Sequence, residues 1–231
     1  MQSKGINTSD IIIRTDDIKK SYGETHAMRG ISLDIKRGEV LAIMGPSGSG
    51  KSTLLHTLAG ITKPDSGKVY FNGSRIDNLN DRQRTMLRRN KFGFVFQFSQ
   101  LVPELTAIDN VAVPMLLNGI DKKTAYHKAE QWLNKVGISD AKLYHLANQL
   151  SGGQIQRVAI ARAMIINPEV LFADEPTGSL DSLNSELVMK MFIKTAKENG
   201  TTVVMVTHEP TIAAYADREI IVRDGRIEGQ E

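Results

Sequence analysis

The sequence predicts an α/β fold with a parallel β-sheet at its centre. Three apolar runs, at residues 40–44, 170–173 and 202–206, are continuous rather than alternating with polar residues. Such runs are typical of strands that are buried on both faces of a parallel sheet. The order of strand, helix and strand indicates an α/β core. The helical patterns between these runs lie at residues 51–60, 122–136, 154–166 and 185–199.

The N-terminal third of the chain has a different pattern. Short apolar runs at residues 11–13, 31–35 and 68–71 are predicted strands. The last of them is followed by Asn72-Gly73, a strong signal of a tight hairpin. We therefore expect an antiparallel edge sheet that joins the core in this region.

The rest of the chain completes the predicted organisation. Residues 98–149 contain the only tryptophan and are mostly helical in pattern, which predicts a helical lobe inserted between core strands. Asp224-Gly225 separates two short strand patterns, at residues 219–222 and 226–227, and predicts a second hairpin. A length of 231 residues allows one large domain or two small ones.

The composition excludes several kinds of site. Without cysteine, the chain can form no disulfide, thiol nucleophile or cysteine-ligated metal centre, which fits a reducing compartment such as the cytosol. The first ten residues lack the apolar stretch of a secretory signal, and no uncharged apolar run approaches the ~20 residues that cross a bilayer. The net charge of +3 is too small to indicate a partner.

One basic run invites a nucleic-acid interpretation. Its cations are interleaved with Met86 and Leu87 at helical spacing, and no stacking aromatic residues accompany them. A solvated helix face is the favoured interpretation, so we expect no nucleic-acid partner. The run consists of Arg82, Arg84, Arg88, Arg89 and Lys91.

A glycine-rich segment predicts a nucleotide triphosphate site. It fits the pattern Gly-x-x-x-x-Gly-Lys-[Ser/Thr], follows a buried strand and opens a helix. Its glycines let backbone N–H groups converge on phosphate oxygens at the positive end of the helix. We expect Lys51 to reach the β and γ phosphates and Ser52 to offer an oxygen to Mg²⁺. The predicted phosphate-binding residues are Gly45, Pro46, Ser47, Gly48, Ser49, Gly50, Lys51, Ser52 and Thr53.

Two carboxylates follow the apolar run at residues 170–173. Asp174 and Glu175 are expected at the end of that strand, beside the phosphate loop. Asp174 is the predicted Mg²⁺ ligand, acting through water, and Glu175 the predicted general base for the attacking water. An isolated Asp-Glu pair is more often a solvated strand end, and the nearby phosphate loop is what favours catalysis here.

A third motif, Leu-Ser-Gly-Gly-Gln at residues 150–154, lies shortly before Asp174 and opens a helix. Ser151 is a favoured N-cap and the glycines leave N–H groups free, so the motif is a second anion cradle. The pentapeptide resembles the signature of the ATP-binding cassette (ABC) ATPases. In that family the signature of one subunit closes over the ATP of another. The resemblance therefore implies a head-to-tail dimer in which Ser151, Gly152, Gly153 and Gln154 contact ATP.

The resemblance covers essentially the whole chain and implies a fold. This is a P-loop NTPase (RecA-like) core with an antiparallel β subdomain and an inserted α-helical subdomain, with ATP and Mg²⁺ as ligands. The core would comprise residues 1–97 and 161–231. The helical subdomain, at residues 98–160, would carry the signature.

Four further positions match family motifs in order. Tyr22 resembles the aromatic residue that stacks on adenine, with packing on the edge sheet as the alternative. Gln97 resembles the glutamine that contacts Mg²⁺ and water. The segment that contains Asp181 resembles the loop that crosses the dimer interface, and His208 resembles the switch histidine at the γ-phosphate. The implied catalytic residues are Lys51, Gln97, Glu175 and His208, and the implied metal ligands are Ser52, Gln97 and Asp174.

Residues 94–97, 101–111 and 172–181 resemble most the macrolide-export and lipoprotein-release group, whose relatives include bacitracin-resistance and FtsE-type ATPases. Its members are free-standing subunits that bind a MacB- or FtsX-like permease, which implies a place at the cytoplasmic face of the membrane. A periplasmic or extracellular adaptor is an optional further partner. Cell division and import stay open as alternatives, and the transported substrate is not determined.

The helical lobe begins with an apolar stretch that allows two interpretations. In the family, this region receives a short cytoplasmic helix of the permease. Alternatively, the stretch packs only within the core of the lobe itself. Its residues are Phe98, Leu101, Val102, Pro103 and Leu105.

Overall fold

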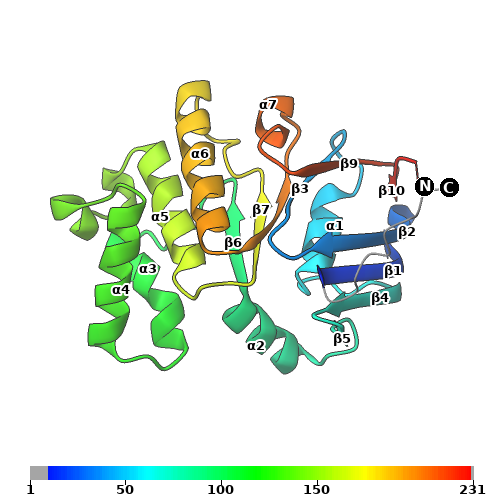
Figure 1. The fold of residues 1–231 in the computed structure, drawn as a ribbon, viewed down its shortest axis with the longest axis horizontal. Helices are drawn as coiled ribbons and strands as arrows, with labels where there is room; N and C mark the ends of the chain where they lie inside the picture. The colour runs from blue at the N-terminus through cyan, green and yellow to red at the C-terminus, as the bar shows by residue number, and fades with distance from the viewer. Residues whose placement is uncertain (1–9, 230–231) are drawn as a thin grey trace.

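The computed structural model describes residues 10–229. The expectation that the N-terminus lacks a secretory signal concerns residues 1–9, and these lie outside the described residues. Figure 1 shows a central sheet with a group of helices on one side and a second sheet on the other. The strands are β1 (Ile11–Tyr22), β2 (Thr25–Lys36), β3 (Val40–Met44), β4 (Ser66–Phe71), β5 (Ser74–Arg75), β6 (Phe92–Phe96), β7 (Val170–Asp174), β8 (Thr202–Val206), β9 (Arg218–Arg223) and β10 (Arg226–Ile227). The helices are α1 (Lys51–Leu58), α2 (Asp81–Lys91), α3 (Ala107–Leu117), α4 (Lys122–Lys135), α5 (Gly152–Met164), α6 (Ser182–Glu198) and α7 (Pro210–Ala213), with short 3₁₀ helices η2 (Asp140–Tyr144) and η3 (Ala147–Gln149).

The central sheet has six strands in the order β10-β9-β3-β8-β7-β6. The pairs that join β9, β3, β8, β7 and β6 are all parallel, and β10 pairs antiparallel with β9. Nearly every residue of β3, β7 and β8 is buried. These strands confirm the predicted α/β core and the three buried apolar runs.

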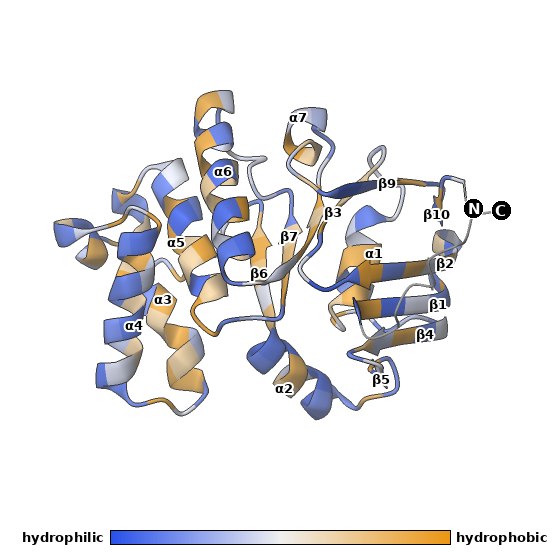
Figure 2. Cartoon of the chain, viewed as in Figure 1, coloured by the Kyte–Doolittle hydropathy of each residue, from blue (hydrophilic) through white to orange (hydrophobic). Residues whose placement is uncertain are grey.

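Both faces of the central sheet are covered. Along β3, Val40 and Ala42 pack with the helices α3 to α6, whereas Leu41 and Ile43 pack with α1 and the second sheet. Figure 2 shows the apolar residues concentrated on the central strands, while α2 and the outer side of α4 are mostly hydrophilic. As a result, α1 and α5 lie on opposite faces of the central sheet.

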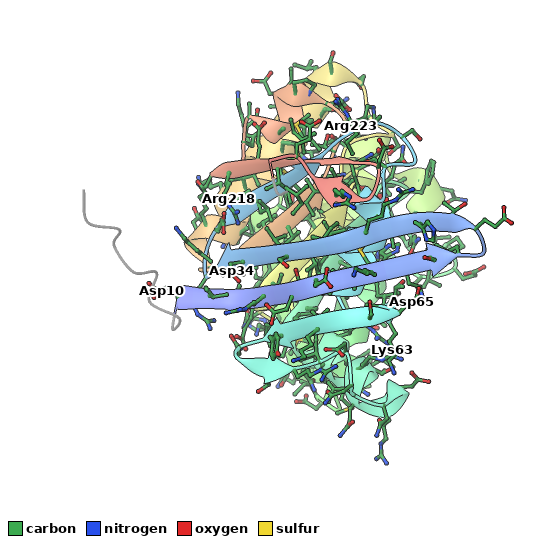
Figure 3. The ribbon with its side chains drawn as sticks, turned by 90° about the vertical axis from the view of Figure 1, so that its right-hand side faces the viewer. Asp10, Asp34, Lys63, Asp65, Arg218 and Arg223 are labelled. Carbon is green, nitrogen blue, oxygen red and sulfur yellow. The ribbon has the colours of Figure 1, made fainter. Side chains whose placement is uncertain are left out.

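The second sheet is antiparallel, with the strand order β2-β1-β4-β5. It is a separate sheet rather than an extension of the central one. Arg218 of β9 donates to the carbonyl oxygen of Asp34 in β2 at 2.7 Å, which links the two sheets at the edge seen in Figure 3. β1 and β2 have 12 residues each and are longer than the predicted strands. A register shift at Asp17, which has a left-handed φ of +46°, interrupts the alternation and hid this length in the sequence.

The remaining predictions concern hairpins, helices and the lobe. Asn72-Gly73 and Asp224-Gly225 form the two predicted hairpins. Residues 98–149 contain α3, α4, η2 and η3, as the pattern predicts. The signature helix α5 runs without a break through residue 160, so the subdomain division at that position stays a prediction. No helix in the described part of the chain is both long and apolar enough to span a membrane.

The predicted basic run forms α2, in which no residue is fully buried. Several of its cations are engaged within the chain. Arg88 donates to the carbonyl oxygen of Gly60 at 2.7 Å, Arg89 donates to the Asn118 side chain at 2.5 Å, and Lys91 pairs with Glu169 at 2.8 Å. These contacts fit the interpretation of α2 as a solvated structural helix.

Candidate functional site

The phosphate loop is shaped by glycines that no other residue can replace without strain. Gly45 has a φ of +143°, and a Cβ there would lie 2.0 Å from the carbonyl oxygen of Val222. Gly50 has a φ of +103°, and a Cβ there would lie 2.1 Å from the carbonyl oxygen of Ala27. The loop therefore sits closely against two backbone segments and leads directly into α1. No side chain caps the first turn of α1, which leaves its N–H groups available to an anion.

The side chains of the loop fit a phosphate. Lys51 is buried, and its Nζ donates to the carbonyl oxygen of Pro46 at 2.7 Å, within its own loop. The Ser49 hydroxyl is buried and has no hydrogen-bond partner in the part of the chain that the structure describes. A confined ammonium beside free backbone donors is the chemistry that binds a triphosphate.

The two predicted carboxylates lie at the carboxyl end of β7, beside the phosphate loop. The Ser52 hydroxyl donates to Asp174 Oδ1 at 3.2 Å, which joins the start of α1 to this strand end. Burial raises the pKa of the Asp174 carboxyl; the Ser52 hydrogen bond and His56 oppose this shift, and the charge of Glu175 adds to it. Hydroxyl and carboxylate oxygens are the ligand types that Mg²⁺ prefers.

Glu175 is turned toward His208 by its backbone. It has a left-handed φ of +47°, and its N–H donates to the carbonyl oxygen of Val206 at 2.9 Å. Its Oε1 lies 2.9 Å from Nδ1 of His208, which follows β8. The structure thus brings these two predicted catalytic residues into direct contact.

Gln97 completes the predicted set. A hollow of 370 Å³ is lined by Ser52 of α1, Gln97 after β6, and Asp174 and Glu175 at the end of β7, so three segments contribute to it. The Ser179 hydroxyl donates to the carbonyl oxygen of Gln97 at 2.9 Å, so the loop that precedes α6 supports the one that carries Gln97. The four residues face one space that can hold a water molecule and a phosphate.

The signature forms a second, separate cradle. Ser151 is the N-cap of α5, and its hydroxyl accepts from the N–H of Gln154 at 3.4 Å. The Gln154 side chain accepts in turn from the N–H of Ser151 at 2.9 Å. Since α5 and α1 lie on opposite faces of the central sheet (Figure 1), the two cradles of one chain do not face one triphosphate.

Comparison with known proteins decides the family. The pattern of the ABC transporter family matches residues 28–178, which contain the phosphate loop, the signature and both carboxylates. The chain belongs to the ABC transporter family. It is therefore an ATP-binding ATPase, and its central fold is that of the ABC cassettes.

Individual relatives cover nearly the whole cassette. The chain is 48% identical to the lipoprotein-releasing system ATP-binding protein LolD of Aquifex aeolicus, over 95% of this chain and 97% of the relative. It is 46% identical to the ABC transporter ATP-binding protein YknY of Bacillus subtilis, over 94% and 95% of the two chains. A dimeric post-hydrolysis structure of the cassette MJ0796, bound to ADP and Pi, is 40% identical over 95% and 98% of the two chains, with a TM-score of 0.86.

Tyr22 and Asp181 are among the predicted site residues that do not line the hollow. Tyr22 ends β1 and is 53% exposed, and the Lys20 ammonium lies 5.5 Å from the centroid of its ring. An exposed ring fits stacking on a base better than packing on the sheet. Asp181 caps α6 by accepting from the backbone N–H of Asn184 at 3.0 Å and from its side chain at 2.6 Å.

The sequence patterns missed two residues of α5 that hold the Gln97 loop. Gln156 is buried and contacts the backbone next to Gln97, and Arg162 donates to the carbonyl oxygens of Ser99 and Gln100 at 2.6 Å. Burial lowers the pKa of Arg162. A polar side chain on the apolar face of the predicted helix at 154–166 was the available signal.

Proposed function

We propose that this chain powers a membrane transporter for lipoprotein release or export, by hydrolysing ATP between the phosphate loop of one copy and the signature of another. The observation that carries the proposal is the shared hollow lined by Ser52, Gln97, Asp174 and Glu175. The dimeric MJ0796 cassette and the LolD relatives support the assembly and the class of transport. The cassette would lie at the cytoplasmic face of the membrane, held by its permease.

The residues have separate roles in the proposed reaction. Backbone N–H groups of the phosphate loop and the Lys51 ammonium bind the β and γ phosphates. Glu175 accepts a proton from the water that attacks the γ phosphorus. The bond between the γ phosphorus and the oxygen that bridges it to the β-phosphate breaks, and ADP and inorganic phosphate leave. His208 orients the Glu175 carboxylate through the 2.9 Å contact.

Mg²⁺ would be held by Ser52, Asp174 and Gln97, and when bound it supplies charge neutralisation on the phosphates. Their oxygen donors fit the ion. Tyr22 would stack on the adenine ring. In the dimer, Ser151, Gly152, Gly153 and Gln154 would bind the triphosphate held by the other copy, and Asp181 would lie at the interface.

The variant Glu175→Gln tests the catalytic assignment. The amide keeps the shape of the side chain but cannot take the proton, so turnover should fall by about 10²- to 10⁴-fold while ATP still binds. With both cradles filled and hydrolysis blocked, a dimer should accumulate in size-exclusion chromatography with ATP and Mg²⁺. Glu219→Gln, on the exposed side of β9, is the matched control and should hydrolyse ATP normally. A wild-type rate in Glu175→Gln would reject the assignment.

The proposed permease contact begins at the first residues of the helical lobe. Phe98 is 77% exposed and Val102 43% exposed, whereas Leu101 packs partly against the core of the lobe. Burial of such side chains at ~25 cal/mol per Å² contributes a few kcal/mol to docking. The exposure of Phe98 and Val102 therefore supports a docking role for them, whereas Leu101 packs within the lobe.

The variant Val102→Asp tests this contact. It should release the subunit from its permease in co-purification and leave the ATP affinity of the isolated chain near normal. Tyr144→Asp, another exposed position of the lobe, is the control and should stay bound. Retained co-purification of Val102→Asp would reject docking at this surface. Loss of both binding properties would show that the lobe had unfolded.

A further inference from the structure

α5 carries a buried polar side chain that the proposed function does not use. Gln156 lies just after the signature and is 1% exposed, on the face of α5 that meets the central sheet and the loops at its edge. Burial of an amide is unfavourable unless its donors and acceptor have partners. The partners of Gln156 therefore show which segments this side chain holds in place.

Gln156 joins two loops that come from different strands. Its Nε2 donates to the carbonyl oxygen of Pro176 at 2.5 Å and to that of Phe96 at 3.3 Å. Its Oε1 accepts from the hydroxyl of Ser99. Phe96 directly precedes Gln97, and Pro176 directly follows Glu175. One side chain thus connects the backbone beside Gln97 with the backbone beside Glu175, two residues that line the hollow.

The loop after Gln97 needs such support because of its backbone. Ser99 and Gln100 both have a left-handed φ of +46°, which is unfavourable for residues other than glycine. A strained conformation persists only where its surroundings hold it. Arg162, further along α5, provides part of that support by donating to both carbonyl oxygens at 2.6 Å. α5 is therefore the element that fixes this loop.

We propose that Gln156 is a positioning residue for ATP hydrolysis, which holds the Phe96 and Pro176 backbones so that Gln97 and Glu175 face one space. The inference rests on the proposed roles of Gln97 and Glu175. The helix that carries Gln156 begins at the signature. Gln156 therefore connects the helix of the signature with both loops of the chain's own ATP site.

The variant Gln156→Met tests the proposal in the full-length chain. Methionine keeps the volume of the side chain but removes its strong donor and acceptor. The value of kcat should fall by about 10- to 100-fold, because small displacements of catalytic groups have effects of that size. The dissociation constant for ATP should stay near the wild-type value, since Gln156 does not touch the phosphate loop. A wild-type kcat would overturn the proposal.

A control variant separates positioning from simple loss of helix packing. Val158 is fully buried in α5, and Val158→Ala removes packing without removing a polar contact. At a temperature where both variants are fully folded, Val158→Ala should keep a near-normal kcat. An equal loss of kcat in Val158→Ala would overturn the proposal.

Ser99→Ala adds a readout that a purely structural role would not produce. It removes the hydroxyl that donates to Gln156, so it should lower kcat in the wild-type background and have no further effect in Gln156→Met. Fully additive effects would contradict the proposal. Glu175→Gln distinguishes the two levels: normal hydrolysis there rejects the proposed function itself. If Glu175→Gln stops hydrolysis but Gln156→Met hydrolyses ATP normally, only the positioning role of Gln156 is rejected.

Discussion

The two anion cradles of this chain are built in different ways. In the phosphate loop, Gly45 and Gly50 adopt left-handed conformations against neighbouring backbone, and Lys51 lies confined beside them. In the signature, Gly152 and Gly153 have ordinary helical backbones, and a Cβ at Gly153 would meet its nearest neighbour only at 3.4 Å. The glycines of the first cradle lie against neighbouring backbone, whereas those of the second lie beside the side chains of Leu180 and Asn184.

The cradles also differ in charge and in their free donors. The phosphate loop supplies an ammonium and lies beside Asp174, whereas the first turn of the signature helix contains no charged residue. The signature also uses two of its own N–H groups, those of Ser151 and Gln154, in the cap of α5. We therefore expect the phosphate loop to bind a triphosphate by itself and the signature to need an anion that another copy presents.

An assay that mixes two variant subunits gives the largest expected effect and tests the separate roles of the two cradles. Lys51→Ala removes the cation of the first cradle, and Ser151→Arg blocks the second. Turnover by each variant alone should fall by on the order of 10³-fold, the size of effect expected when a cation that stabilises the transferred phosphate is lost. Lys51→Ala removes such a cation, and Ser151→Arg obstructs the cradle that would contact the same phosphate from the other copy. In an equal mixture, half of the dimers combine the two variants and contain one intact composite site. Activity should then recover to about a quarter of wild type.

The mixture has a control and a contrary outcome. Lys51→Ala mixed with itself, at the same total concentration, should show no recovery. If the mixture of the two variants recovers nothing at any ratio while mixed dimers are detected, the cradles do not act between copies. The comparison between a self-sufficient and a dependent cradle would then be wrong.

A matched pair of glycine substitutions tests the structural side of the comparison. Gly45→Ala places a Cβ 2.0 Å from a backbone oxygen at a φ of +143°, so the free energy of unfolding should fall by about 1–3 kcal/mol or more. Gly153→Ala lies in a helix with room for the methyl group and should be neutral or stabilising by up to about 1 kcal/mol. Denaturant unfolding of both variants measures the difference. Equal destabilisation would contradict the contrast.

The same contrast explains what the sequence could and could not predict. The phosphate loop was predictable because its glycines and lysine form a recognisable sequence pattern, and the buried strands were predictable because β3, and β8 after Thr202, are continuously apolar. The length of β1 was hidden by the bulge at Asp17. The role of Gln156 was missed because its partners at Phe96, Ser99 and Pro176 are distant in sequence, and the contacts at Phe96 and Pro176 use backbone atoms. A polar residue on the apolar face of the helix does not reveal which segments it contacts.

Two aspartates give the smallest predicted effects, and these have opposite signs. Burial raises the pKa of Asp174 beside the first cradle, whereas hydrogen bonds from Asn184 lower the pKa of Asp181, close to the second. The folded chain therefore holds the Asp174 proton to higher pH than the unfolded chain does. The free energy of unfolding therefore falls as the pH rises from the pKa of Asp174 in the unfolded chain to its higher pKa in the folded chain. The ionised form of Asp181 favours folding instead, and its contribution is lost as the pH falls through its lowered pKa.

The variants Asp174→Asn and Asp181→Asn measure these signs in nucleotide-free protein with a chelator. Asp174→Asn should raise the melting temperature at neutral pH, by a margin that shrinks toward acidic pH, because the amide avoids a buried charge. Asp181→Asn should lower it slightly or leave it unchanged, since asparagine is also a favoured N-cap. A lower melting temperature for Asp174→Asn at neutral pH would contradict the interpretation. Under the proposed function, Asp174 is retained at a cost in stability because it would help to hold a metal beside the triphosphate, a role that we do not assign to Asp181.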